Sequence, residues 1–161
     1  AAVHFAYAPG GTYDFARNGI ISAAGNKTRW YYYVQKANTQ IKAIDHVLMN
    51  SANIGMIVHG KKANLLADTQ ADDRDELIRD GKFRQLTSVS GDDCFVGCFD
   101  YNGGTALYVV NNSRKDKANV TLNFDKTYGY EVIQRAVSAE VAAKNLPLTL
   151  EAGEGVLVGL K

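Results

Sequence analysis

Two cysteines, Cys94 and Cys98, have the most reactive side chains in the 161-residue sequence. On a β-strand, a spacing of four residues places both thiols on one face, with Cα atoms about 13 Å apart. A disulfide needs Cα atoms within about 7 Å, and no second Cys or His pair has the spacing of zinc ligands. The pattern therefore predicts two small buried apolar side chains and no metal or redox pair.

Acidic side chains are concentrated in one polar segment, where calcium binding is the chemistry to consider. They are Asp68, Asp72, Asp73, Asp75 and Glu76. A calcium loop needs ligands at alternating positions, a Gly at the sixth position and a Glu at the twelfth. The segment does not have this pattern, so we interpret it as a solvated linker and predict no metal site.

The histidines His4, His46 and His59 are far apart in the sequence, and no Ser or Cys lies in a recognisable nucleophile elbow. The sequence therefore offers no recognisable nucleophile for a hydrolytic triad. The Gly-containing segments 103–105 and 152–155 do not open a helix after a strand, as a phosphate-binding loop would. The sequence predicts no catalytic residues and no cofactor.

The charge balance and hydropathy exclude two classes of partner. Eighteen basic and seventeen acidic residues give a net charge of +1, whereas nucleic-acid binding usually needs a concentrated basic surface. No run of eighteen or more apolar residues is present, so no membrane span is predicted. The first residues lack the basic region and cleavage site of a signal peptide, and none is predicted.

The N-terminal third predicts a short strand, a loop and one long helix. Residues 1–8 read as a buried strand, and a loop rich in Gly, Pro and Asn follows. The helix is predicted over residues 28–50, with Asn26 or Thr28 as its N-cap. Its apolar residues recur at steps of three and four and form one stripe: Trp30, Val34, Ala37, Ile41, Ile44 and Leu48. This spacing is typical of an amphipathic helix.

Beyond the helix, the pattern changes to that of a mainly β protein. A short strand is predicted around residues 54–58, and residues 61–82 read as a polar linker. From residue 83 to 161, seven short strand-like runs alternate with turn signals, including Asn102-Gly103-Gly104. Such spacing is typical of a compact antiparallel β-sandwich.

A resemblance to a known enzyme family rests on the residues around the helix. Residues 6–50 resemble the last β/α unit of barrel glycoside hydrolases of the β-galactosidase-like kind, and the sandwich resembles the C-terminal domain that closes these and α-amylase-type chains. The matching positions are Asn26, Lys27, Thr28, Tyr31 to Tyr33, Gln35, Lys36 and Asn38. The resemblance implies that residues 1–60 are the terminal β/α unit of an incomplete (β/α)8 barrel.

The resemblance also implies where a substrate would lie. Active sites of such barrels form at the C-terminal ends of the strands, which would place Tyr7 and the following loop on the substrate side. In the intact parent enzyme, Tyr7 and Tyr13 would stack on a sugar ring, and Asp14 and Arg17 would bind its hydroxyls. The catalytic carboxylates would come from earlier strands that this sequence does not contain. The chain is therefore expected to be non-catalytic by itself.

Two alternatives remain open at this point. The chain could be a stand-alone carbohydrate-binding or protein-interaction sandwich, with its tyrosines forming the binding surface: Tyr101, Tyr108, Tyr128 and Tyr130. It could also self-associate, or pack against another surface, through the helix at residues 28–50, since a large uncovered apolar patch usually finds a partner.

Overall fold

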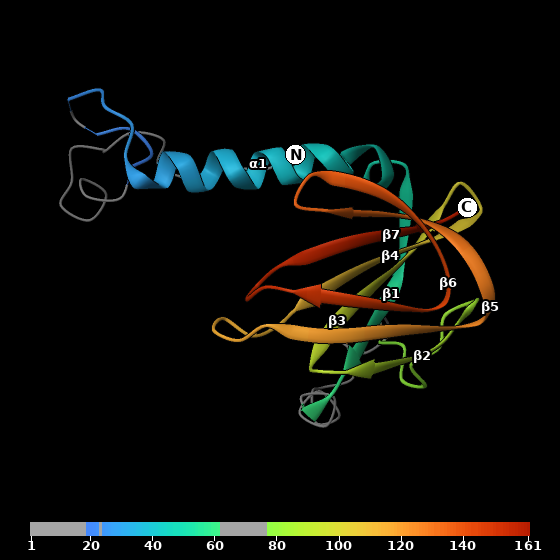
Figure 1. Cartoon of the computed structure of the whole chain (residues 1–161). Helices are drawn as coiled ribbons and strands as arrows, with labels where there is room; N and C mark the ends of the chain where they lie inside the picture. Colours follow the sequence, from blue (N-terminus) through green and yellow to red (C-terminus); the bar gives the residue numbers. More distant parts are fainter. Residues whose placement is uncertain (1–18, 23, 62–76) are drawn as a thin grey trace. The chain divides into compact units, whose positions relative to one another are not determined.

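The computed structural model describes residues 19–22, 24–61 and 77–161 of the chain. The chain divides into two compact units, Ala1–Ala43 and Ile44–Lys161. Its described part is mainly β, with one helix followed by a curled antiparallel sheet (Figure 1). The mainly β, sandwich-like fold predicted from the sequence is confirmed. The predicted strand at residues 1–8 lies outside the described residues.

The helix α1 spans Arg29–Leu48 and confirms the predicted helix to within two residues at each end. Thr28 immediately precedes it, and the Tyr31 N–H donates to the Thr28 carbonyl at 3.1 Å. At the other end, side chains satisfy carbonyls that lack partners within the helix. The Asn50 amide donates to the His46 carbonyl at 2.7 Å, and the Ser51 hydroxyl donates to the Val47 carbonyl at 2.7 Å.

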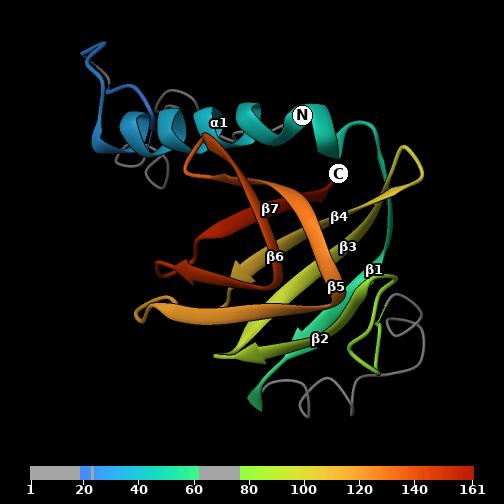
Figure 2. The same ribbon diagram turned by 45° about the vertical axis from the view of Figure 1, so that its right-hand side comes forward.

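Seven antiparallel strands form one sheet in the order β1-β3-β4-β7-β5-β2, with β6 paired to β5 (Figures 1 and 2). The strands are β1 (Ser51–His59), β2 (Leu86–Gly91), β3 (Cys94–Tyr101), β4 (Gly104–Asn111), β5 (Ala118–Gln134), β6 (Val137–Leu150) and β7 (Gly155–Leu160). The hairpin between β3 and β4 turns at Asn102 and Gly103, whose φ values are 51° and 77°. These positive values are typical of a type I′ turn, so the predicted Asn-Gly turn is confirmed.

The sheet curls because β5 is long enough to belong to two parts of it. Residues near its start pair with β2, whereas Tyr130–Gln134 pair with β7, and β6 follows β5 on both sides of an irregularity between Asn123 and Tyr128. Figure 2 shows β5 and β6 as long curved strands. The curl allows apolar side chains from β3, β4 and β7 to share one core with those from β2, β5 and β6.

Alternation of side chains along each strand fills this core. In β3, Cys94, Val96 and Cys98 are buried and the residues between them are partly exposed. In β5, Val120, Leu122 and Phe124 are buried and the residues between them are partly exposed. In β6, Leu146, Leu148 and Leu150 are buried and the residues between them are exposed. This is the period of two that a strand imposes on its inward and outward faces. The result is an apolar interior without charged side chains among its described members.

The strand boundaries differ from the predicted ones in two places. The sequence pattern predicts three separate strands at residues 119–124, 130–137 and 146–150. The first two belong largely to the single strand β5, and the third is the end of β6, which begins at Val137 rather than at Leu146. The predicted strand at residues 54–58 is β1, which begins at Ser51 and pairs with β3. The predicted division of the chain into residues 1–60, 61–82 and 83–161 stays a prediction. β1 lies within the first of these segments, but it pairs with β3 in the sheet.

Candidate functional site

The residues predicted to contact sugar lie outside the part of the chain that the structure describes. These residues are Tyr7, Tyr13, Asp14 and Arg17. The same holds for His4 and for the acidic residues between 68 and 76. The candidate site is therefore built from the described residues of the first unit, which are a short turn and the N-terminal part of α1.

A cavity of about 360 Å³ lies along α1 in this unit. Ile20, Tyr31 and Val34 supply its apolar lining, and Gln35, Asn38, Thr39 and Lys42 supply its polar lining. Residues three and four apart on a helix share a face, which explains why six of these side chains come from α1. Gln35, Asn38 and Lys42 lie outside the predicted apolar stripe, and a cavity was not predicted there.

A compact turn positions Ile20, the lining residue that comes from outside the helix. Ile21 and Lys27 form an antiparallel bridge, and the Ser22 N–H donates to the Asn26 carbonyl at 2.8 Å. The Thr28 hydroxyl lies 2.8 Å from the Gly19 carbonyl and 3.0 Å from the Ile20 carbonyl, and it can donate to either. Thr28 thus occupies the predicted N-cap position, but its side chain anchors the preceding turn.

Among the described lining residues, the cavity carries one positive charge. Lys42 lines it, and none of the described lining residues is acidic. A second cation lies close to one lining residue, because the Lys27 Nζ is 4.3 Å from the ring centroid of Tyr31. A cation over an aromatic face is attracted to the negative face of the ring. The charge of Lys42 favours an anionic group in the cavity.

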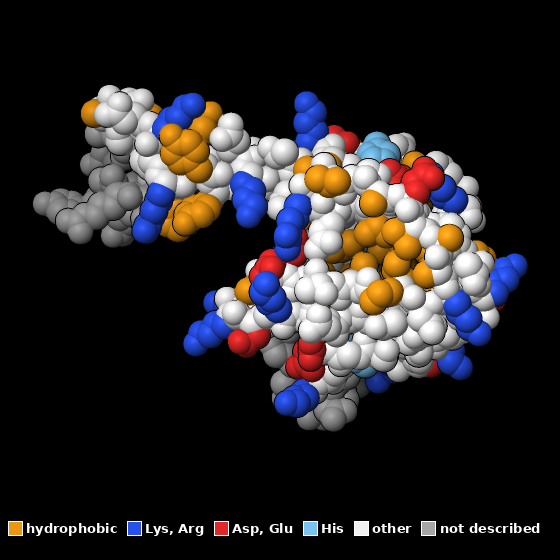
Figure 3. Space-filling view, in the orientation of Figure 1, with side chains coloured by type: hydrophobic (Ala, Val, Ile, Leu, Met, Phe, Trp, Pro, Cys, Tyr) orange, Lys and Arg blue, Asp and Glu red, His pale blue; other side chains and the backbone are white. Residues whose placement is uncertain are grey.

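A second surface of the first unit is the uncovered part of the predicted apolar stripe. Trp30 is 37% exposed, Ile41 is 44% exposed, and Tyr33 beside them is 61% exposed. Trp30 and Tyr33 contact each other edge to face, with ring centroids 5.8 Å apart. We call Trp30, Tyr33 and Ile41 the exposed stripe. Figure 3 shows apolar side chains and Lys or Arg side chains together near the start of α1.

Further along the same helix, Ile44 and Val47 are buried. They belong to the second unit. The helix therefore leaves its apolar side chains exposed near its start and buries them near its end. A surface helix of a folded domain usually buries its apolar stripe over its whole length. Among the described residues, no element covers the exposed stripe in this way.

The two cysteines are free and buried, as predicted. Burial raises the pKa of each thiol to about 12, and the charge of Asp93 adds to this effect at Cys94. Only the thiolate is an effective nucleophile. Both residues therefore serve as small core side chains.

We expect both thiols to resist modification by Ellman's reagent at pH 8 while the chain is folded. Both should react rapidly in urea, where the thiols regain an ordinary pKa near 8.5. Protection should disappear with the same urea dependence as the circular dichroism signal of the sheet. Immediate reaction of either thiol in the folded chain would contradict the buried, protonated state.

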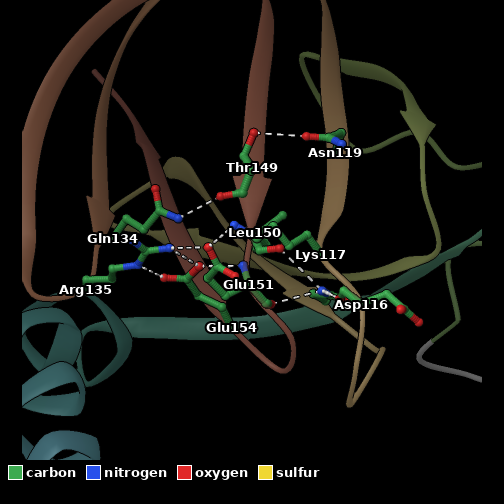
Figure 4. Close-up of polar contacts among 10 residues, drawn as sticks. Asp116, Lys117, Asn119, Gln134, Arg135, Thr149, Leu150, Glu151 and Glu154 are labelled. Atoms are coloured by element: carbon green, nitrogen blue, oxygen red, sulfur yellow. Dashed lines mark hydrogen bonds and ion pairs between the residues drawn. The ribbon is translucent and has the colours of Figure 1, made fainter.

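A polar network ties two loops together at one end of the second unit (Figure 4). Arg135 donates to the Glu154 carboxylate at 2.6 and 3.1 Å and lies 3.5 Å from Glu151. Burial by itself would raise the pKa of Glu154. Hydrogen bonds from Arg135, the Glu151 N–H and Gln134, together with the charge of Arg135, outweigh that effect and lower the pKa overall. The Glu154 carboxylate is therefore ionised and paired with Arg135. These contacts hold the two loops together.

The sandwich tyrosines do not form an exposed aromatic platform. Tyr130 is buried, and its hydroxyl donates to the Ala143 carbonyl at 3.0 Å. Tyr101, Tyr108 and Tyr128 are each only partly exposed. The large apolar side chains that are exposed in the second unit are aliphatic or Met, and they are Met49, Ile54, Val137 and Val141.

Comparisons with known proteins found no match: no protein-family model, no curated protein and no solved structure matches the chain. Within residues 19–22, 24–61 and 77–161, no group of three or more His, Cys, Asp or Glu side chains could hold a metal ion. The single helix in these ranges lacks the hydropathy that crossing a membrane requires.

Proposed function

We propose that the chain is the C-terminal part of a glycoside hydrolase, in which the sandwich is a structural accessory domain without catalytic activity of its own. The observation that supports the proposal best is the exposed stripe of α1. The resemblance of the helix and its flanks to the last β/α unit of a barrel explains this stripe, because the outer helices of a (β/α)8 barrel pack against their neighbours. The proposed occupant of the stripe is therefore the catalytic barrel of the same enzyme.

The exposed stripe has the chemistry of a helix-packing surface. Tyr33 lies three residues after Trp30, and Ile41 lies eight residues after Tyr33. Ala37 between them is small enough to allow close approach of a second helix. Helices pack with axes about 8–10 Å apart when side chains of one fill the grooves of the other. Full burial of an exposed apolar side chain of this size contributes about 1.5–3 kcal/mol. Because Trp30, Tyr33 and Ile41 are already partly buried, covering the rest of each contributes only a part of that amount, in the direction that favours a contact between domains.

The alternative is a stand-alone carbohydrate-binding or protein-interaction module. A sugar-binding sandwich usually presents exposed aromatic rings, since their faces stack on the apolar face of a sugar. Here the exposed rings, Trp30, Tyr32 and Tyr33, belong to the helix, and the tyrosines of the sandwich are buried or partly buried. This distribution favours the accessory role over a sugar-binding sandwich.

The proposal is tested with the purified 161-residue chain against a panel of aryl α- and β-glycosides. We expect no release of the aryl group above the buffer control, because glycoside hydrolysis needs two suitably spaced carboxyl groups, which the proposal assigns to the barrel. Loss of the circular dichroism signal on heating verifies that the assayed chain was folded. Turnover that follows the chain through a second purification and disappears on unfolding would contradict the non-catalytic role.

A further inference from the structure

We propose that the cavity along α1 binds a single sugar ring that carries a carboxylate, as a uronic acid does. The inference rests on the proposed function for its carbohydrate class. It extends that function by assigning a ligand to a site formed by Ile20 and α1. None of its described lining residues belongs to the exposed stripe.

The size and lining of the cavity fit one pyranose ring. A volume of about 360 Å³ lies at the small end of the range for ligand pockets. Ile20, Tyr31 and Val34 provide apolar surface for the C–H face of a ring. Such a mixture of apolar lining and a few polar groups is typical of small-molecule sites.

The polar lining matches the edge of a sugar. The Gln35 side chain offers both a donor and an acceptor, and Lys42 offers three donors. The Thr39 hydroxyl donates to the Gln35 carbonyl at 2.9 Å, so its oxygen keeps lone pairs that can accept from a sugar hydroxyl. These groups lie on one helical face, so one ligand can reach them together.

Charge selects a carboxylate over a neutral sugar. Lys42 lines the cavity and has no ion-pair partner among the described residues. Lys27 adds a second positive charge over the ring of Tyr31, which also lines the cavity. A hydrogen bond to a charged group contributes more to binding than one between two neutral groups. A carboxylate would neutralise this excess positive charge.

The site is also held in place before a ligand arrives. Ile20 is 7% exposed. Its carbonyl accepts from both the Thr28 N–H and the Thr28 hydroxyl, at 3.0 Å in each case. This contact joins the turn to the start of the helix that carries every other described lining residue. Preorganisation of this kind lowers the entropy cost of binding.

The test is a titration of the full ¹⁵N-labelled chain with D-glucuronate, followed by amide chemical shifts. D-glucose and acetate serve as separate probes of the ring and of the charge. We expect saturable shifts at residues 19–21 and 31–42 with D-glucuronate, and weaker binding of both D-glucose and acetate. Lys42→Gln should weaken D-glucuronate binding by about tenfold or more and leave the weak D-glucose binding unchanged.

Lys36→Gln is the matched control, because Lys36 is exposed and does not line the cavity. This variant should bind D-glucuronate as the unchanged chain does. The proposal is overturned if D-glucuronate gives no saturable shifts, if D-glucose or acetate binds equally well, or if Lys42→Gln and Lys36→Gln have equal effects. Thermal unfolding of both variants confirms that they are folded.

The outcome is independent of the test of the accessory role. Shifts confined to the sandwich residues 86–161 would contradict the cavity and support the alternative binding module. A chain that binds nothing but shows no glycosidase activity would contradict only the cavity. Turnover of aryl glycosides would contradict only the proposed accessory role.

Discussion

Replacing Phe124 with alanine is expected to lower the free energy of unfolding of the sandwich by about 3–5 kcal/mol. Phe124 is 1% exposed and lies in the shared core. Its ring centroid is 4.8 Å from that of Tyr130 and 6.3 Å from that of Tyr128. The substitution removes the ring from the part of β5 that pairs with β2, where the curl of the sheet leaves little freedom for neighbouring side chains to fill the space.

Urea unfolding followed by far-ultraviolet circular dichroism measures this loss. Val137→Ala is the control, because Val137 is a large apolar side chain that is 66% exposed. Its replacement should change the free energy of unfolding by no more than about 0.5 kcal/mol. Equal effects of the two substitutions would mean that the β5 side chains do not form the core that the alternating burial indicates.

Replacing Asn111 with alanine is expected to cost about 2–4 kcal/mol. Asn111 is a polar residue that is only 2% exposed, at the end of β4. Its amide nitrogen lies 2.8 Å from the Asp116 carbonyl, 2.9 Å from the Glu151 carbonyl and 3.4 Å from the Leu150 carbonyl, and its side-chain oxygen accepts from the Ser113 N–H at 2.8 Å. Alanine removes all of these hydrogen bonds, of which the one to the Leu150 carbonyl is buried and the others are partly buried.

Two further variants test whether the lost hydrogen bonds cause the loss of stability in Asn111→Ala. Asn111→Asp keeps the acceptor for Ser113 but places a carboxylate against carbonyl oxygens, so it should be at least as destabilising as alanine at pH 7. Asn119→Ala removes an exposed amide whose oxygen accepts from the Thr149 hydroxyl at 3.0 Å. It should cost no more than about 1 kcal/mol. Urea unfolding of the three variants provides the comparison, and a loss below about 0.5 kcal/mol for Asn111→Ala would rule out a structural role for its hydrogen bonds.

The sequence predicted those strands whose side chains alternate between buried and exposed. The alternation of Cys94, Val96 and Cys98 predicted β3, and the Asn-Gly turn predicted the hairpin to β4. The sequence did not predict the first half of β6. All but one of residues 137–145 are exposed, so no buried apolar face distinguishes this segment from a loop. It also divided β5 at Asp125 to Thr127, where polar residues mark a local irregularity and not a turn.

The turn between β5 and β6 illustrates a second reason for the missed strand. Arg135 and Ala136 have φ values of 53° and 63°, a left-handed conformation that Gly and Asn adopt more readily. Neither residue is a turn signal in the sequence. Their conformation is supported by the ion pair of Arg135 with Glu154, nineteen positions away. A contact over that distance cannot be predicted from local sequence pattern.

The candidate cavity was missed for a similar reason. Its polar residues lie outside the apolar stripe, so the pattern gave no reason to expect a cavity there. The turn before α1 brings Ile20 to the start of the helix, where the Thr28 hydroxyl can donate to the Gly19 or the Ile20 carbonyl. The apolar stripe was predicted from its spacing, but the sequence could not indicate that Trp30 and Ile41 are exposed whereas Ile44 is buried.

The central claim is that the exposed stripe of α1 is a packing surface for another domain. Its most direct test is the fluorescence of an apolar dye bound to the chain, compared with the Trp30→Gln/Ile41→Gln variant. Met49→Gln is the control, because Met49 is 74% exposed but lies outside the stripe. We predict bright dye fluorescence for the unchanged chain and for Met49→Gln, and a severalfold decrease for the double variant. Equal dye fluorescence for all three proteins would contradict the claim.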